Sequence, residues 1–299
     1  MTTVDAHHHL WDLSVRDQPW LARPYLAPLR RNFTLSDLEP LVAEEDVTAT
    51  VVVQTVTEPE ETPELLALAA GSDLIAGVVG WVDLEAPGVT DALGALREVP
   101  GAGLLVGIRH PVLSEPDRDW LARPAVLRGL AAVAAAGLTY DVVVMPAHLP
   151  AAVTAALATP QLTFVLDHLG NPEVGAAVDE SWARAFGAFA ALPNTVAKLS
   201  GFLGEPVPGG HAPEAVRAAE GGVPTAHLRP YYEIALADFG PPRLMFGSDW
   251  PVSTIDVGYG GVHAAARSLT ADLSAAEKAA IFSETAQRTY RLPATSRTP

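Results

Sequence analysis

The stretch VDAHHHLW at residues 4–11 joins a short apolar strand pattern to three consecutive histidines. Side chains alternate between the two faces of a strand, so His7 and His9 point to one side and His8 to the other. An open, doubly wound α/β sheet usually carries a glycine-rich turn after its first strand. Because His, Leu and Trp stand there instead, we expect a closed barrel.

The rest of the chain repeats one pattern, in which short runs rich in Val, Ile and Leu alternate with Ala- and Leu-rich segments of helical spacing. Runs such as TVVV at 50–53 show little polar alternation, as expected of strands buried on both faces. The predicted strands are 4–9, 49–54, 75–82, 103–109, 138–144, 162–168, 195–200 and 244–248. The predicted helices include 62–70, 89–98, 125–136, 149–158, 180–192, 228–239 and 274–290. Eight successive β–α units predict a single (β/α)₈ TIM barrel over residues 1–299.

The composition narrows the classes of function. The chain has 299 residues, 49% of them hydrophobic, enough for a large core. A formal net charge of −16 argues against binding to nucleic acid or anionic membranes, since both need a basic surface. There is no cysteine, so a metal ion would need His and carboxylate ligands. With no signal peptide or membrane span in the sequence, we expect a cytoplasmic protein that acts on a small molecule, and homo-oligomerisation is left open.

Two connections are longer than usual: residues 10–37 after the first strand and residues 202–228 after the seventh. Both follow the carboxyl end of a strand, which is the face where barrels place their active sites. They are candidates for covering a substrate, and a surface insertion without function is the alternative.

Three features place chemistry at that face. His7 and His9 end the first predicted strand, His168 ends the sixth in TFVLDHLGNP at 163–172, and Asp249 follows the eighth in RLMFGSDWP at 243–251. Each alone has a structural explanation: a polar turn, a hydrogen bond at a strand end, or a helix N-cap. Together they lie at one end of one barrel, where imidazoles and a carboxylate can hold a divalent ion or a substrate group.

At this point the chain resembles the amidohydrolase superfamily, in its amidohydrolase 2 branch of lactonase-like proteins. The resemblance covers nearly the whole sequence, and its motifs occur in the expected order. They are DAHHHLWD at 5–12, VGIRH at 106–110, LDHLG at 166–170, AKLSG at 197–201, LRPY at 228–231 and FGSDWPV at 246–252.

The resemblance implies a distorted, amidohydrolase-type barrel and a ligand set of His7, His9, His168 and Asp249. The superfamily's strand-four and strand-five ligands are missing here, since strand four ends in Arg109 and His110 and no His follows strand five until His148. We therefore do not expect two ions, and two options of equal weight stay open. The first is a single divalent ion, zinc in the first place. The second is a lactonase that works without a tightly held metal.

The resemblance also implies a reaction. Members of this branch open small lactones, so Asp249 is expected to act as general base and His168 to assist at the carbonyl, on a sugar-acid lactone. A metal-dependent decarboxylase and a non-catalytic ligand-binding barrel are the competing interpretations. The side chains expected to bind substrate, with buried ion pairs or packing as the alternative, are Arg109, His110, Lys198, Trp81 and Gln54.

Overall fold

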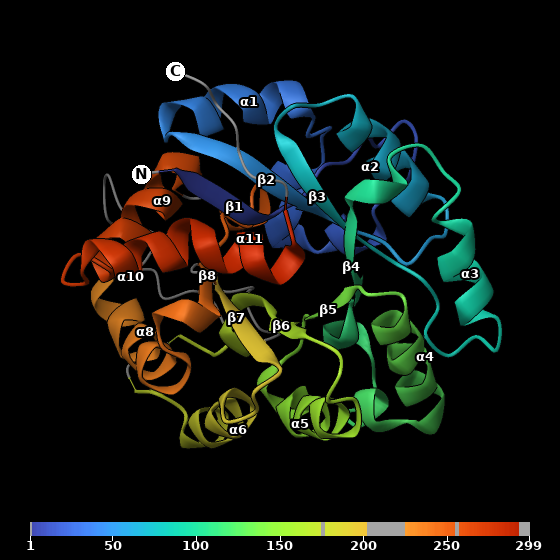
Figure 1. The fold of residues 1–299 in the computed structure, drawn as a ribbon. Helices are drawn as coiled ribbons and strands as arrows, with labels where there is room; N and C mark the ends of the chain where they lie inside the picture. The colour runs from blue at the N-terminus through green and yellow to red at the C-terminus, as the bar shows by residue number, and fades with distance from the viewer. Residues whose placement is uncertain (1, 175–176, 202–224, 255–256, 293–299) are drawn as a thin grey trace.

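The protein is described by a computed structural model that covers residues 2–174, 177–201, 225–254 and 257–292. Eight parallel strands lie side by side in the order of the sequence, as Figure 1 shows. They are β1 (Thr3–His8), β2 (Val47–Val53), β3 (Ile75–Gly80), β4 (Leu105–His110), β5 (Thr139–Val142), β6 (Phe164–Leu166), β7 (Thr195–Leu199) and β8 (Leu244–Phe246). All eight predicted strands are confirmed, within three residues at each end.

The residues after β8 join it to β1 and bring the ends of the sheet together. The backbone N–H of His9 donates to the carbonyl of Trp250 at 2.7 Å, and that of Asp249 donates to the carbonyl of His7 at 2.8 Å. Two of the residues singled out in the sequence, 242 positions apart, are therefore hydrogen-bonded neighbours where the barrel closes.

Helices surround the strands (Figure 1), as the alternation predicts. They are α1 (Leu35–Glu44), α2 (Glu61–Ala70), α3 (Val89–Ala95), α4 (Pro124–Ala135), α5 (Leu149–Ala158), α6 (Glu180–Ala190), α8 (Thr225–Phe239), α9 (Gly258–Leu269), α10 (Ala275–Ala279) and α11 (Thr285–Tyr290). The predicted set lacks α1 and α9. Helix α9 opens with Gly-Tyr-Gly-Gly and α1 contains Pro40, residues that weaken the helical signal in a sequence. The predicted helix at 274–290 is interrupted by a π-turn at Ala280–Glu284.

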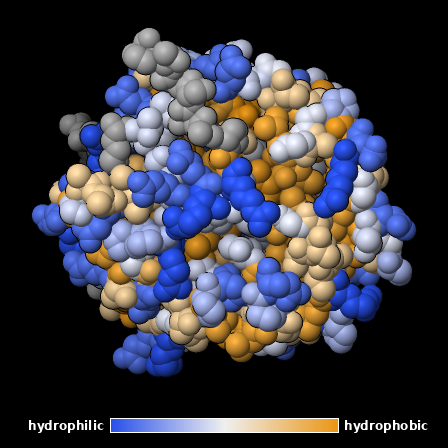
Figure 2. Space-filling model, in the orientation of Figure 1, coloured by the Kyte–Doolittle hydropathy of each residue, from blue (hydrophilic) through white to orange (hydrophobic). Residues whose placement is uncertain are grey.

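The long connection after β1 is ordered by its own contacts. It contains two short 3₁₀ helices, Pro19–Ala22 and Pro24–Leu29, and Trp11 and Phe33 pair through two backbone hydrogen bonds of 3.0 and 2.9 Å. Most of the second long connection, residues 202–224, lies outside the described residues. The face drawn in Figure 2 intersperses polar and apolar side chains, and no helix among the described residues is both long and apolar enough to cross a bilayer.

Candidate active site

Two histidines at the end of β1 face each other across a short gap. The Nε2 atoms of His7 and His9 are 3.2 Å apart, and both residues are buried. His8 points the other way, with its Nε2 3.0 Å from the Oγ1 of Thr50 on β2. The alternation of strand side chains therefore places His7 and His9 on one side, as expected.

His168 and Asp249 complete this cluster from backbone turns just beyond β6 and β8. Both have φ of 53°, in the left-handed region that non-glycine residues rarely adopt and that is over-represented at functional sites. The Oδ1 of Asp249 lies 3.6 Å from the Nε2 of His7, 3.5 Å from that of His9 and 3.8 Å from that of His168. Three imidazoles thus converge on one carboxylate oxygen.

Two glycines let the backbone come close enough to make the cluster. A Cβ on Gly247, next to β8, would lie 2.8 Å from the Cβ of His7. A Cβ on Gly201, which has φ of +66°, would lie 2.6 Å from the His168 ring. Any side chain at either position would displace one of the clustered histidines.

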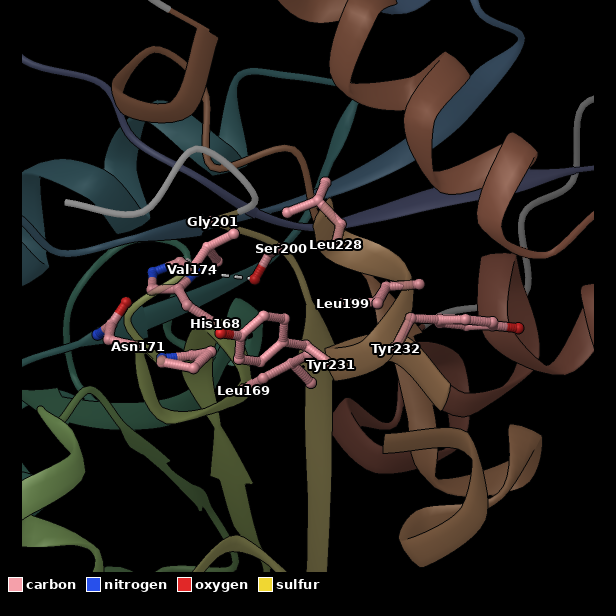
Figure 3. Close-up of a pocket in the computed structure, with 11 residues that line it drawn as sticks. His168, Leu169, Asn171, Val174, Leu199, Ser200, Gly201, Leu228, Tyr231 and Tyr232 are labelled. Carbon is pink, nitrogen blue, oxygen red and sulfur yellow. Dashed lines mark hydrogen bonds between the residues drawn. The ribbon is translucent and has the colours of Figure 1, made fainter. Parts of the chain in front are cut away.

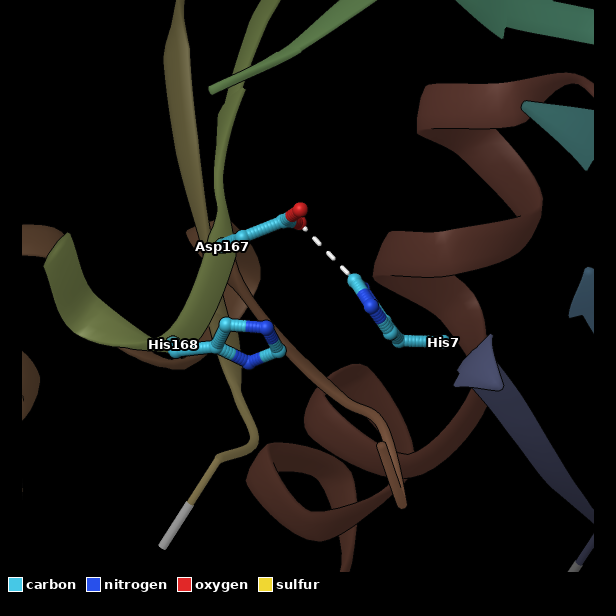
Figure 4. Close-up of side chains that lie close together, drawn as sticks. All are labelled: His7, Asp167 and His168. Atoms are coloured by element: carbon cyan, nitrogen blue, oxygen red, sulfur yellow. Dashed lines mark ion pairs between the residues drawn. The ribbon is translucent and has the colours of Figure 1, made fainter. Parts of the chain in front are cut away.

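Each member of the cluster is held by a partner behind it. The Nδ1 of His9 is 2.8 Å from the carbonyl of Val53, and the Nδ1 of His168 is 2.8 Å from the Oγ of Ser200. The Nδ1 of His7 faces the carboxylate of Asp167 at 3.3 Å, the ion pair drawn in Figure 4. The second oxygen of Asp249 accepts from the Oγ of Ser253 at 2.5 Å. These contacts leave the three Nε2 atoms facing the Oδ1 of Asp249.

The electrostatics of the cluster favour the neutral forms of His7 and His168 and the ionised form of Asp249. Burial lowers the pKa of His7 and of His168 below the ordinary imidazole value. Burial alone would raise the pKa of Asp249, but His168, His9 and His7 outweigh it and hold that pKa well below its usual range. Neutral imidazole and ionised carboxylate are the forms that ligate metals.

The donor atoms fit a single metal ion. Ligand bonds of about 2.0–2.2 Å in a tetrahedral site put the donors about 3.3–3.6 Å apart. The distances among the Nε2 atoms of His7 and His9 and the Oδ1 of Asp249 are 3.2, 3.6 and 3.5 Å, with His168 slightly farther from Asp249 at 3.8 Å. Within the described part of the chain, two groups of donors are close enough to share an ion. One is His7, His9 and Asp249, and the other is His7, Asp167 and His168, so the groups overlap at His7.

A buried group of charged side chains lies behind the cluster. It includes Lys198 and Arg109, which the sequence predicts to bind substrate. The Nζ of Lys198 is 2.5 Å from the Oδ2 of Asp141, 3.0 Å from the Oδ1 of Asp167 and 3.0 Å from the Nδ1 of His7, and its side chain is wholly buried. Arg109 donates to Asp167 at 3.1 Å and to the backbone carbonyl of Gln54 at 2.5 Å. Lys198 and Arg109 therefore pair with buried carboxylates, and the Oε1 of Gln54 accepts from Arg109. Contact between these three side chains and a substrate stays a prediction.

His110 and Trp81 lie farther out, beside the ends of β4 and β3. The indole N–H of Trp81 donates to the Nδ1 of His110 at 3.1 Å, and the Nε2 of His110 is 2.8 Å from Glu115. The His110 ring is stacked on Trp120 with a centroid distance of 4.2 Å. Both ring nitrogens of His110 are thus occupied, whereas Trp81 remains partly exposed. Contact between Trp81 and a substrate stays a prediction.

The sequence did not predict two supporting carboxylates, Asp141 and Asp167, or one supporting hydroxyl, that of Ser253. Asp141 stands inside the apolar run TYDVVV, and Asp167 precedes His168. A carboxylate within a buried strand must meet a cation or a donor, so its position was itself a signal of a buried network. Which cation it would meet depends on strand pairing and could not be predicted locally.

The comparisons with known proteins agree with this geometry. The profile of the amidohydrolase family matches residues 4–292. An L-fucono-1,5-lactonase of Burkholderia ambifaria is 36% identical over 84% of this chain and 81% of its own length. A second L-fucono-1,5-lactonase, from Burkholderia multivorans, is 34% identical over 97% of this chain and 96% of its own length.

A solved structure gives the same result in three dimensions. An amidohydrolase from Burkholderia multivorans with bound zinc superposes with a TM-score of 0.86 at 33% identity, over 98% of this chain and all (100%) of its own. The fold and the family inferred from the sequence motifs are therefore confirmed. The chain belongs to the amidohydrolase family.

Proposed function

We propose that this enzyme opens a sugar-acid lactone by adding water to its carbonyl. The observation that carries the proposal is the Asp249 carboxylate facing three imidazoles, an arrangement that can activate water and hold a carbonyl oxygen at one place. The names of the two lactonase relatives, each more than 30% identical over most of this chain, support the same reaction.

In the proposed reaction, Asp249 accepts a proton from the attacking water as the oxygen bonds to the lactone carbonyl carbon. The bond between that carbon and the ring oxygen then breaks, and the proton passes to the ring oxygen, giving a hydroxy acid. Ser253 and the surrounding imidazoles keep the carboxylate in place throughout.

We further propose that His7, His9, His168 and Asp249 hold one zinc ion. When bound, this ion would supply Lewis acidity for the carbonyl. The spacing of the donors of His7, His9 and Asp249 supports the proposal, as does the zinc in the Burkholderia multivorans structure. His168 joins this set through its Nε2, which lies 3.8 Å from the Oδ1 of Asp249. A second ion lacks support in the described residues, because Arg109 of β4 binds Asp167 and His148, after β5, bonds to Met145.

The buried charges support an uncharged substrate. A lactone with carboxylate substituents would call for a free guanidinium or ammonium group at the cluster. The two cations next to the cluster within the described residues, Arg109 and Lys198, are each bound to buried carboxylates. A hydroxyl-rich sugar lactone needs no such cation.

Acid release from a panel of lactones tests the proposal. The panel contains L-fucono-1,5-lactone, other aldonolactones and a pyrone-dicarboxylate lactone, followed with a pH indicator. We expect release from an aldonolactone and none from the dicarboxylated lactone. A chain that releases acid from no lactone would overturn the proposal, and release from the pyrone alone would overturn the choice of substrate.

The close approach of Gly247 to His7 gives a further expected result. In Gly247→Ala the new methyl group would push His7 away from Asp249. A shift of this kind costs about 100-fold in rate, so kcat/KM for the lactone should fall by about that factor. Gly94→Ala in α3, where an added Cβ meets nothing within 4 Å, is the matched control and should keep wild-type activity. Equal activity of the two variants would show that the position of His7 is unimportant.

A further inference from the structure

A buried carboxylate on β1 faces the seam where the barrel closes. The side chain is that of Asp5, which is 0% exposed. Its Oδ1 accepts from the backbone N–H of His7 at 3.1 Å and from the backbone N–H of Ser248 at 2.8 Å. Its Oδ2 accepts from the hydroxyl of Tyr259 on α9 at 2.9 Å. One side chain thus bonds the backbone of β1 to the turn that follows β8.

The seam differs from the rest of the barrel in how its two sides are joined. Each strand from β1 to β8 pairs with the next in a ladder, whereas the described residues at the seam form one isolated bridge instead. The position of Asp249 relative to His7 therefore depends on individual bonds. The N–H of Asp249 and the Oγ of Ser248 donate to the carbonyl of His7 at 2.8 and 3.3 Å, and Asp5 binds the N–H groups of His7 and Ser248.

Asp249 depends on these supports because its backbone is strained. Its φ of 53° lies in the left-handed region, and a non-glycine residue keeps this conformation only where the surrounding structure fixes it. Ser248, the residue before it, is bonded to Asp5 through its N–H, and its Oγ lies between the carbonyl of His7 and the N–H of Trp250, which donates to it at 3.0 Å. Without Asp5 the N–H of Ser248 would be buried without a partner, so we expect the turn to move until that group finds one.

We propose that Asp5 is a positioning residue, which sets the separation between His7 and Asp249 by holding the backbone on both sides of the seam. For its effect on rate, the inference rests on the proposed lactone hydrolysis. A displacement of about 1 Å at a reacting group costs about 100-fold in rate. Because the displaced groups act on the reacting atoms, the loss should fall mainly on kcat.

Crystal structures of the wild-type enzyme and of Asp5→Ala test the position directly. Both proteins are crystallised after chelator treatment, so that no ion holds the two groups together. The Nε2 of His7 and the Oδ1 of Asp249 are 3.6 Å apart in the wild-type chain, and we expect this separation to change by about 1 Å in the variant. An unchanged separation would overturn the inference, whatever the activity.

Rates of lactone hydrolysis separate positioning from a general loss of stability. Asp5→Ala should lower kcat by about 100-fold. Asp5→Asn should stay within about tenfold of wild type, because the amide oxygen can still accept from both N–H groups and the amide nitrogen can donate to the hydroxyl of Tyr259. An Asp5→Asn enzyme as slow as Asp5→Ala would overturn the inference, because the charge of Asp5 and not its hydrogen bonds would then matter.

Thr195→Val is the matched control for a lost buried hydrogen bond. The Thr195 hydroxyl lies at the start of β7, away from the cluster, and donates to the carbonyls of Phe189 and Leu192 at 3.0 and 2.8 Å. This variant should keep wild-type kcat. If it lost as much activity as Asp5→Ala, the effect of Asp5 would be one of stability alone, and the inference would be wrong.

Tyr259→Phe is a milder variant, which decides the matter if Asp5→Ala does not fold. It removes only the bond to the Oδ2 of Asp5, so kcat should fall several-fold. Tyr232→Phe is its matched control, because the Tyr232 hydroxyl is buried without a partner in the described part of the chain and points away from His168 (Figure 3). The control should keep wild-type kcat, and equal kcat of the two tyrosine variants would then overturn the inference.

The outcomes separate this inference from the proposed function. If the wild-type enzyme hydrolyses no lactone, the proposed function fails, and the two crystal structures still decide whether Asp5 sets the separation. If the wild-type enzyme is active and Asp5→Ala keeps both the separation and kcat, the proposed function stands and the inference is wrong.

Discussion

Asp249→Asn should lower kcat/KM for the lactone by about 10³-fold, because the amide can accept no proton from water. Asparagine has nearly the same size and can still accept a hydrogen bond from Ser253, so the fold should be preserved. Steady-state rates of acid release measure the loss.

The control for this variant is Asp91→Asn, which makes the same replacement of a carboxylate by an amide at an exposed position on α3. It should keep wild-type kcat/KM. An Asp249→Asn enzyme within tenfold of wild type would contradict the role of Asp249 as general base, provided that both variants unfold at the same temperature as the parent.

The second large effect concerns stability. Lys198→Met removes the ammonium group that Asp141 and Asp167 share, and leaves both carboxylates buried beside an apolar side chain. Breaking a buried ion pair in this way costs about 3–5 kcal/mol. We therefore expect the free energy of unfolding, measured by urea titration, to fall by that amount.

Lys278→Met is the matched control, because Lys278 donates only to one backbone carbonyl at the surface. This substitution should change the free energy of unfolding by less than about 1 kcal/mol. If Lys198→Met were as stable as this control, the buried ion pairs of Lys198 would not stabilise the fold, contrary to this account. If it kept its stability but raised the KM for lactone alone, Lys198 would be a substrate contact, as the sequence suggested.

The barrel and the grouping of the four clustered residues could be predicted from the sequence, because both depend on local patterns along the chain. Eight apolar runs separated by helical segments predict parallel strands with helical crossovers. The missing glycine-rich turn after the first run favours a barrel over an open sheet. Residues at the carboxyl ends of those strands must share one face, which is why His7, His9, His168 and Asp249 could be grouped before any coordinates.

The sequence could not assign the roles of residues whose neighbours come from other strands. Lys198 and Arg109 both stand near strand ends, like a substrate contact, yet each side chain turns toward Asp167. Only the register of β4, β6 and β7 in the sheet decides this pairing. The helix α9 was missed for a different reason: its glycines are weak helix formers, and packing against the barrel stabilises it instead.

The most direct test of the central claim is a titration of chelator-treated enzyme with zinc, following hydrolysis of L-fucono-1,5-lactone. If His7, His9, His168 and Asp249 hold a single ion, activity should rise in proportion to added zinc and reach its plateau at one equivalent. Full activity before any zinc is added, or a plateau at two equivalents, would contradict a single-zinc site.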